Sequence, residues 1–164
     1  MELDLLDNLV KCLFGMLEKP DLAVADYPIG LPDKLKDFED TVLLPQQKSG
    51  KPQIFGISGS GGVGKTTFLK HFFNAKKSDY HNSCFLFEVR DNAAKSSLES
   101  LQIQLLKNLA GSDTQVNIVV NSVDEGKMML RSSLKSSKAL VILDDVNDVN
   151  HVHALLPVQT YDLC

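Results

Sequence analysis

The sequence lacks the marks of secreted and membrane-spanning proteins. It has only three cysteines, Cys12, Cys84 and Cys164, and they lie far apart with no Cys-x-x-Cys pair, so no disulfide framework is indicated. The first residues, MELDLLD, lack the basic start of a secretory signal. No apolar run approaches the roughly 18 residues that a membrane span requires. We therefore expect a cytoplasmic location and no membrane partner.

An excess of basic residues is also missing. The formal net charge of the 164 residues is −4, which gives no overall attraction to nucleic acid, so we expect no nucleic-acid partner. The sequence contains no internal repeat and no low-complexity tract. Hydrophobic residues make up 43% and charged residues 23%, as is ordinary for a globular protein of one domain.

Glycine, in contrast, is concentrated in one short stretch, GISGSGGVGKTTFLK (56–70). Four glycines fall within six positions: Gly59, Gly61, Gly62 and Gly64. The stretch fits the P-loop pattern GxxxxGK[ST] at Gly59, Gly64, Lys65 and Thr66. In that pattern main-chain amides cradle phosphates, the lysine reaches the terminal phosphates and the hydroxyl ligates magnesium. The pattern therefore predicts a phosphate-binding loop, with Thr66 as a magnesium ligand.

The segments around the glycines support this interpretation over a flexible loop that binds nothing. QIFGIS (53–58) is rich in strand-forming residues, and KTTFLKHFFNA (65–75) has its phenylalanines and leucine at helical spacing. Strand, loop and helix follow in the required order, so the positive end of the helix dipole is aimed at the phosphates.

Strands and helices alternate along the rest of the chain. CFLFEVRD (84–91) reads as a buried strand, 96–111 as a helix that Ser96 or Ser97 caps, and 124–134 as another helix. RSSLKSSK (131–138) reads as a solvated turn, with a binding patch as the weaker alternative. This alternation predicts an α/β fold with a parallel sheet covered on both faces.

A second candidate site element is ALVILDDV (139–146), in which five apolar residues precede two carboxylates. A buried strand of this kind delivers Asp144 and Asp145 at the sheet edge where ligands of open parallel sheets bind. This is a Walker B pattern: Asp144 would hold magnesium, largely through water, and Asp145 would orient or deprotonate an attacking water. A structural role for Asp145 in a turn is the alternative.

The N-terminal part has a different organisation. Residues 1–19 carry an apolar helical stripe, and Pro20, Pro28 and Pro32 then break the chain into an irregular connection. Residues 35–44 read as a helix and 45–52 as a polar turn. We divide the chain into a connector, 1–25, and a nucleotide-binding part, 26–164.

Taken in order, four stretches resemble the NB-ARC domain of plant intracellular immune receptors, with the closest likeness to receptors that carry a TIR-type N-terminal domain. The stretches are YPIGLPDKL, GISGSGGVGKTT, FLFEVRDNAAKSSLESLQIQLLKNL and KALVILDDVNDVNHVHALLP, which cover about 26–157. The resemblance implies a STAND-type ATPase switch that holds ADP at rest and exchanges it for ATP. It also implies adenine contacts from Ile29 and Gly30 and phosphate contacts from the loop as far as its end: Gly62, Val63, Gly64, Lys65, Thr66 and Thr67.

The chain departs from this family where later motifs are expected. The sensor arginine strand, the Gly-Leu-Pro-Leu stretch and the Met-His-Asp motif are absent from the sequence. We therefore expect an incomplete P-loop NTPase-like three-layer fold. Because the sensor strand of the family lies between the P-loop strand and the Walker B strand, those two strands would either pair directly or leave a marginal fold. A second copy, or a full-length receptor, could also supply the missing strand.

Three functions from different classes remain open. The first is a nucleotide switch that binds ADP or ATP with magnesium and turns over little or not at all. The second is a nucleotide-independent interaction module, and the third is another P-loop ATPase or kinase, for which the residues after the Walker B pattern leave little room. Arg90 is interpreted as a surface residue, and His151 with His153 as solvated histidines without a third zinc ligand.

Overall fold

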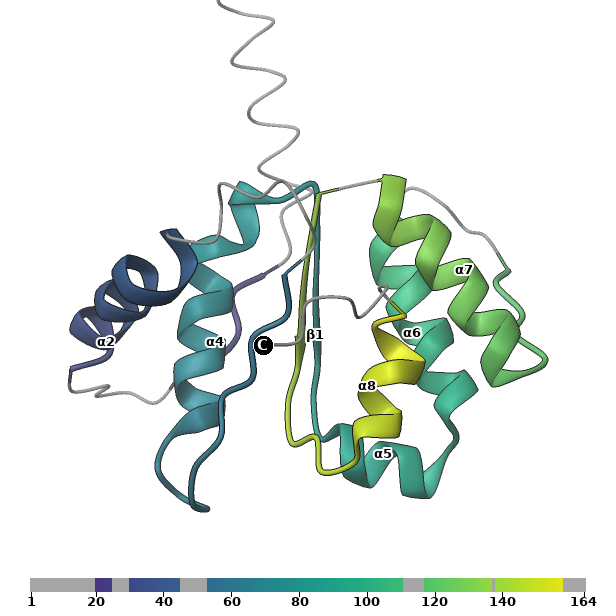
Figure 1. The fold of residues 1–164 in the computed structure, drawn as a ribbon, viewed down its shortest axis with the longest axis horizontal. Helices are drawn as coiled ribbons and strands as arrows, with labels where there is room; N and C mark the ends of the chain where they lie inside the picture. Colours follow the sequence, from purple (N-terminus) through teal and green to yellow (C-terminus); the bar gives the residue numbers. More distant parts are fainter. Residues whose placement is uncertain (1–19, 25–29, 45–52, 111–116, 137, 158–164) are drawn as a thin grey trace, which may run out of the picture.

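The fold is built around two parallel strands with helices on both sides. The computed structural model of the chain describes residues 20–24, 30–44, 53–110, 117–136 and 138–157. The strands are β1 (Asn82–Leu86) and β2 (Ala139–Leu143). One side carries α2 (Leu31–Phe38), η1 (Glu39–Leu43) and α4 (Lys65–Lys76), which continues into η3 (Lys77–Asp79). The other side carries α5 (Val89–Lys95), α6 (Leu98–Ala110), α7 (Val123–Ser136) and α8 (Val149–Leu155) (Figure 1). The predicted α/β class with a covered parallel sheet is confirmed.

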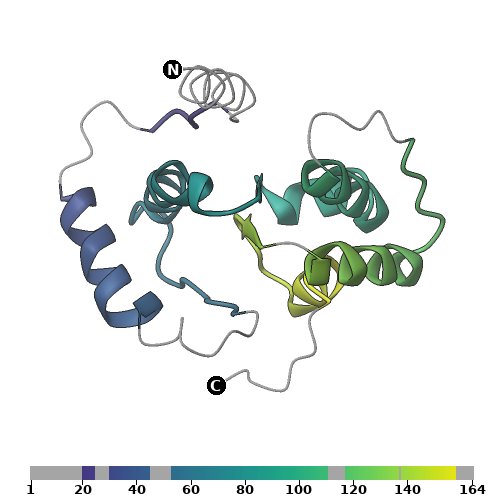
Figure 2. The ribbon, with the colours of Figure 1, turned by 90° about the horizontal axis from the view of Figure 1, so that it is seen from above.

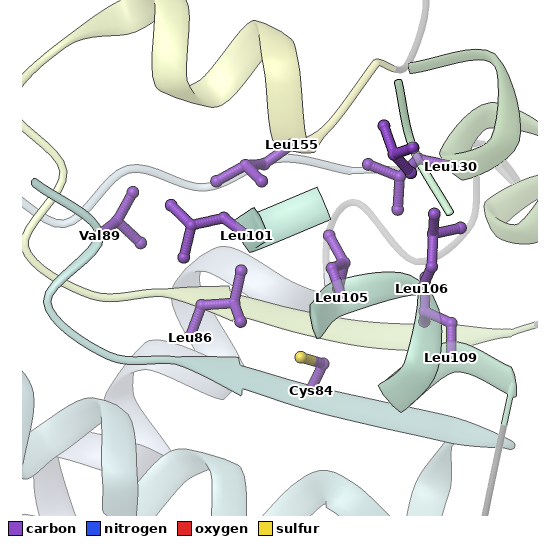
Figure 3. Packing of buried hydrophobic residues seen from close by; sticks show 10 residues of the cluster. Cys84, Leu86, Val89, Leu101, Leu105, Leu106, Leu109, Leu130 and Leu155 are labelled. Atoms are coloured by element: carbon purple, nitrogen blue, oxygen red, sulfur yellow. The ribbon is translucent and has the colours of Figure 1, made fainter. Parts of the chain in front are cut away.

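Side chains of the two strands alternate between two hydrophobic clusters. The strands pair in register from Asn82 opposite Ala139 to Leu86 opposite Leu143. Phe85 and Ile142 pack toward α4, in a cluster with Phe72 and Phe73. The alternate residues of β1 pack toward α6, α7 and α8, in a cluster that Figure 3 shows: Cys84, Leu86, Leu101, Leu105, Leu106, Leu109, Leu130 and Leu155. A strand buried on both faces requires the continuous apolar run seen in its sequence.

The strand predicted at 53–58 is not present. This segment is irregular in the structure, and Ile57 near its end is exposed. A strand exists only through its pairing, and within the described ranges β2 pairs with β1 alone. Of the two expected outcomes, direct pairing of the P-loop strand with the Walker B strand is therefore not found in the described residues, and the other, a marginal fold, stays a prediction. The segment contacts α2 through Phe55, whose ring centroid lies 6.2 Å from that of Phe38.

Several element boundaries differ from those read from the sequence. The strand predicted over 84–91 ends at Leu86, because the chain turns at Glu88 (φ 45°) and Val89 begins α5. The predicted turn over 131–138 is wrong, since α7 continues to Ser136 and packs Leu134 on the larger cluster.

At the N-terminal side, α2 begins at Leu31, inside the stretch taken as irregular. Pro32 lies in its first turn, where a missing amide hydrogen costs nothing.

The amphipathic helix predicted for 1–19 and the turn at 45–52 lie outside the described residues, as do Cys12 and Cys164. None of the helices in the described ranges has the length and hydrophobicity that crossing a bilayer would demand.

Two further helices form where the sequence predicts them, whereas α8 was not predicted. α4 and α6 match their predicted ranges closely, and Ser97 caps α6, because its Oγ accepts a hydrogen bond from the amide of Ser100 at 3.2 Å. The segment before α2 is tied to α4 by Asn74, whose Oδ1 accepts from the amide of Leu22 and whose Nδ2 donates to its carbonyl, both at 2.8 Å.

A buried glutamine joins the three helices of the larger cluster. Gln102 of α6 is fully buried, and its Nε2 donates to the carbonyl oxygens of Val123 in α7 and Ala154 in α8, each at 2.9 Å. Gly126 of α7 lies against this side chain so closely that an added Cβ would be 2.0 Å from Gln102 Oε1. Glycine at 126 is therefore required by the close approach of α6 and α7.

We expect Gly126→Ala to lower the free energy of unfolding by about 1 to 3 kcal/mol, as is typical of overpacking in a filled core. Gln102 cannot swing away without giving up its two hydrogen bonds. The measurement is urea denaturation, with Ser132→Ala on the exposed side of α7 as the control. In the Gly126→Ala/Gln102→Ala double variant the shortened side chain at 102 removes the clash, so the loss of unfolding free energy should be smaller than the sum of the two single losses. Losses that add would contradict the clash.

Candidate phosphate-binding site

The glycine loop leads directly into α4 through residues with left-handed backbones. Gly62 has φ 79° and Gly64 has φ 89°, a region in which other residues are strained. Gly64 is the N-cap of α4, and its carbonyl accepts the first hydrogen bond of the helix, from the amide of Phe68 at 2.9 Å. An added Cβ would meet nothing within 4 Å at Gly61, Gly62 or Gly64, so the space beside the loop is open. Two of these glycines are thus required by conformation and not by crowding.

Lys65 lies across the loop that precedes it. Its Nζ donates to the carbonyl oxygens of Gly59 at 2.7 Å and Ser60 at 2.8 Å. The ammonium group is therefore held at the start of the loop, beside the N-terminus of α4. A positive charge, the positive end of a helix dipole and flexible glycine backbone are the features of an anion site.

Thr66 and Asp144, which are 78 residues apart in the sequence, are in direct contact. Thr66 Oγ1 is 2.9 Å from Asp144 Oδ1 and 3.2 Å from Oδ2, so the hydroxyl donates to the carboxylate. Asp144 is buried, with 6% of its surface exposed, and its amide donates to the carbonyl of Leu86 at 2.9 Å. The two residues predicted to ligate magnesium are brought together, and their side-chain oxygens are the hard ligands that magnesium takes.

A magnesium ion held by Thr66 and Asp144 would not need further carboxylates. Within the described residues no group of three or more histidine, cysteine, aspartate or glutamate side chains could enclose a metal ion. Magnesium does not need such a group, because it keeps several waters and takes phosphate oxygens. Thr66 and Asp144 would hold the ion beside bound phosphates.

Asp145 points to a different partner from its neighbour. Its backbone is left-handed, with φ 54°, and its Oδ2 is 3.0 Å from Nη2 of Arg90 in α5. Arg90 Nε also donates to Asp91 Oδ1 at 3.1 Å. Two causes raise the pKa of Arg90: the hydrogen bond to Asp91 is the larger, and the negative charge of Asp145 is the next. Adjacent carboxylates at the end of β2 are thus divided between α4 and α5.

Arg90 is exposed, as expected from the sequence, but its pairing with Asp145 was not predicted. No local pattern could have shown it, because the contact depends on the turn after β1 meeting the turn after β2. The catalytic role predicted for Asp145 stays a prediction.

On the adenine side, the structure describes Gly30 but not Ile29. Gly30 is the N-cap of α2, with φ 72°. The ring of Phe38 at the other end of α2 has its centroid 5.7 Å from those of both Phe68 and Phe72 in α4, in edge-to-face contacts (Figure 2 shows the two helices from above). These contacts of Phe38 pack α2 against α4, the helix that begins at the phosphate loop. The adenine contacts of Ile29 and Gly30 stay predictions, as do the phosphate contacts of Val63, which is exposed, and Thr67.

A glycine loop that opens a helix, and a helix hydroxyl against the carboxylate at a strand end, define the P-loop class of nucleotide-binding folds. Within that class the chain belongs to the NB-ARC family, because the NB-ARC domain model matches residues 39–161. It is 31% identical to disease resistance-like protein DSC1 of Arabidopsis thaliana over 78% of its length. It is 30% identical to TMV resistance protein N of Nicotiana glutinosa over 90%, and 28% identical to disease resistance protein RPV1 of Vitis rotundifolia over 91%.

The chain spans only 10 to 13% of the length of these three relatives. It is thus similar to one nucleotide-binding module within much longer plant disease resistance proteins. The proposed boundary between a connector (1–25) and the nucleotide-binding part (26–164) stays a prediction.

We expect Gly64→Ala to lower the free energy of unfolding by about 1 to 2 kcal/mol, because alanine is strained in the left-handed region. Gly61→Ala is the matched variant from the same loop, since the backbone of Gly61 is not left-handed and its surroundings are open. We expect it to change the unfolding free energy by less than about 0.5 kcal/mol. Urea denaturation of both variants checks the difference, and equal losses would contradict the loop conformation.

Proposed function

We propose that the chain binds ADP or ATP together with Mg²⁺ and acts as the nucleotide-binding module of a plant NLR-type disease resistance receptor. The observation that carries the proposal is the contact between Thr66 and Asp144 at 2.9 Å, beside a lysine that closes over a glycine loop. Each of these groups suits one part of a magnesium nucleotide. Membership of the NB-ARC family supports the same assignment.

Each residue of the site has a specific task in this proposal. The loop amides and the N-terminus of α4 would receive the phosphates. Lys65 would exchange its bonds to the carbonyls of Gly59 and Ser60 for bonds to phosphate oxygens. Thr66 and Asp144 would hold magnesium, which neutralises the charge of the phosphates and bridges them to the end of β2.

We further propose that the module works as a switch with slow hydrolysis or none. A switch needs a nucleotide that stays bound, and Asp145, the residue that we predict to activate water, has one carboxylate oxygen engaged by Arg90. The state of the nucleotide would then be read by the rest of a receptor or by a second copy of the chain, in the cytoplasm. The likeness to disease resistance proteins supports this reading.

We expect Lys65→Ala to weaken ADP binding by about ten- to a hundredfold, because a charge-assisted hydrogen bond contributes about 1.5 to 3 kcal/mol. Isothermal titration of the 164-residue chain with ADP and Mg²⁺ measures this directly. The control is Lys107→Ala, which removes an exposed lysine from α6 on the other side of the sheet.

Three results of the titration would count against the proposal. Equal affinity in the Lys65→Ala variant would refute the role of the loop. Absence of binding in the wild-type chain would favour a nucleotide-independent interaction module. Rapid steady-state phosphate release would favour a P-loop ATPase or kinase over a switch.

A further inference from the structure

The turn that carries the two aspartates is joined to the start of α5 by main-chain hydrogen bonds. The amide of Val89 donates to the carbonyl of Asp144 at 2.9 Å, and the amide of Arg90 donates to that of Asp145 at 3.2 Å. The N-cap of α5, Glu88, makes no side-chain capping bond. The aspartate carbonyls therefore satisfy two amides that a helix start leaves without partners.

Both sides of this junction have unusual backbones. Glu88 has φ 45° and Asp145 has φ 54°, and they are the two residues other than glycine with positive φ in the described part of the chain. Such conformations are sparsely populated and persist only where the surroundings hold them. Something at this junction must therefore fix the backbone of Asp145.

Arg90 is the residue that contacts Asp145 through both main chain and side chain. Its amide bonds the carbonyl of Asp145, and its Nη2 is 3.0 Å from Oδ2 of the same residue. Its Nε meanwhile bonds Asp91, which aims the guanidinium plane. An exposed ion pair alone contributes little to stability. Here the ion pair and the backbone hydrogen bond both join Arg90 to Asp145, so the strained residue is held at two points.

We propose that Arg90 is a positioning residue for the aspartate turn: it holds Asp145 in its left-handed conformation and so keeps the carboxylate of the preceding Asp144 directed at Thr66. A consequence of this role is that Arg90 supports the magnesium-dependent part of nucleotide binding, and only this consequence rests on the proposed function. Arg90 itself touches neither phosphate nor metal in this role. It acts on the site through one peptide unit.

The first test is independent of nucleotide. Amide hydrogen exchange is measured by NMR in the 164-residue chain and in its Arg90→Ala, Arg90→Lys and Asp91→Asn variants. We expect the amide of Val89 to exchange at least about tenfold faster in Arg90→Ala, because its acceptor is the carbonyl of Asp144 in the loosened turn. Arg90→Lys keeps the charge without the planar fork, so its effect should be intermediate.

Two internal comparisons separate positioning from general loss of structure. The amide of Leu105, in the middle of α6, should exchange at the same rate in all variants. Asp91→Asn removes a charge beside Arg90 but keeps a side-chain oxygen that can accept from Nε, so it should change the exchange of Val89 by less than about twofold. Unchanged exchange of Val89 in Arg90→Ala would overturn the inference, as would an equal acceleration of Leu105.

The second test addresses the consequence for magnesium. The ratio of the ADP dissociation constants in EDTA and in Mg²⁺ is measured for each chain. We expect Arg90→Ala to lose most of the magnesium enhancement and to keep its affinity in EDTA, whereas Asp91→Asn keeps both. An unchanged ratio in Arg90→Ala would overturn the link to magnesium. If the wild-type chain bound no ADP, the proposed function would fail, and the exchange of Val89 would still decide the role of Arg90.

Discussion

The hydrogen bond from Thr66 to Asp144 is the contact on which the site depends, because it joins the first turn of α4 to the end of β2. In the magnesium site that we propose, Thr66 and Asp144 act together, so each needs the other beside it. The contact bridges two parts of the chain that are packed by separate hydrophobic clusters, one against α4 and one against α6, α7 and α8. Both clusters must form for the hydroxyl of Thr66 and the carboxylate of Asp144 to meet. The geometry of the site therefore depends on the packing that stabilises the fold.

The direction of Asp144 is set by the alternation of β2. Ile142 packs toward α4 and Leu143 toward the opposite cluster, so the next residue, Asp144, returns to the side of α4. A slip of one residue in the pairing of β1 with β2 would turn Asp144 away from Thr66. The burial of Phe85 and Ile142 against Phe72 and Phe73 resists that slip, which is how apolar residues far from the phosphates fix a polar contact beside them.

What could be predicted from the sequence is what depends on local pattern. The glycine loop, the helix after it and the carboxylates at the end of β2 each have a signature of adjacent residues, and the structure brings Thr66 and Asp144 together as expected. The strand expected at 53–58 is absent, because strand formation depends on a neighbour that local propensity does not supply. The roles of Phe38 and Arg90 were missed for a related reason: each contacts residues that only the tertiary fold brings near.

The pair of aspartates shows how one short turn gives two identical side chains different environments. Asp144 continues the alternation of its strand and is buried against Thr66, whereas Asp145 leaves the strand in a left-handed conformation and meets Arg90. Their carbonyls also serve α5 as acceptors for its first amides. A change on the α5 side can therefore reach the α4 side through a single peptide unit, without any movement of the sheet. In a module that we propose to work as a nucleotide switch, this junction is a direct route by which the helices on one face could respond to what is bound on the other.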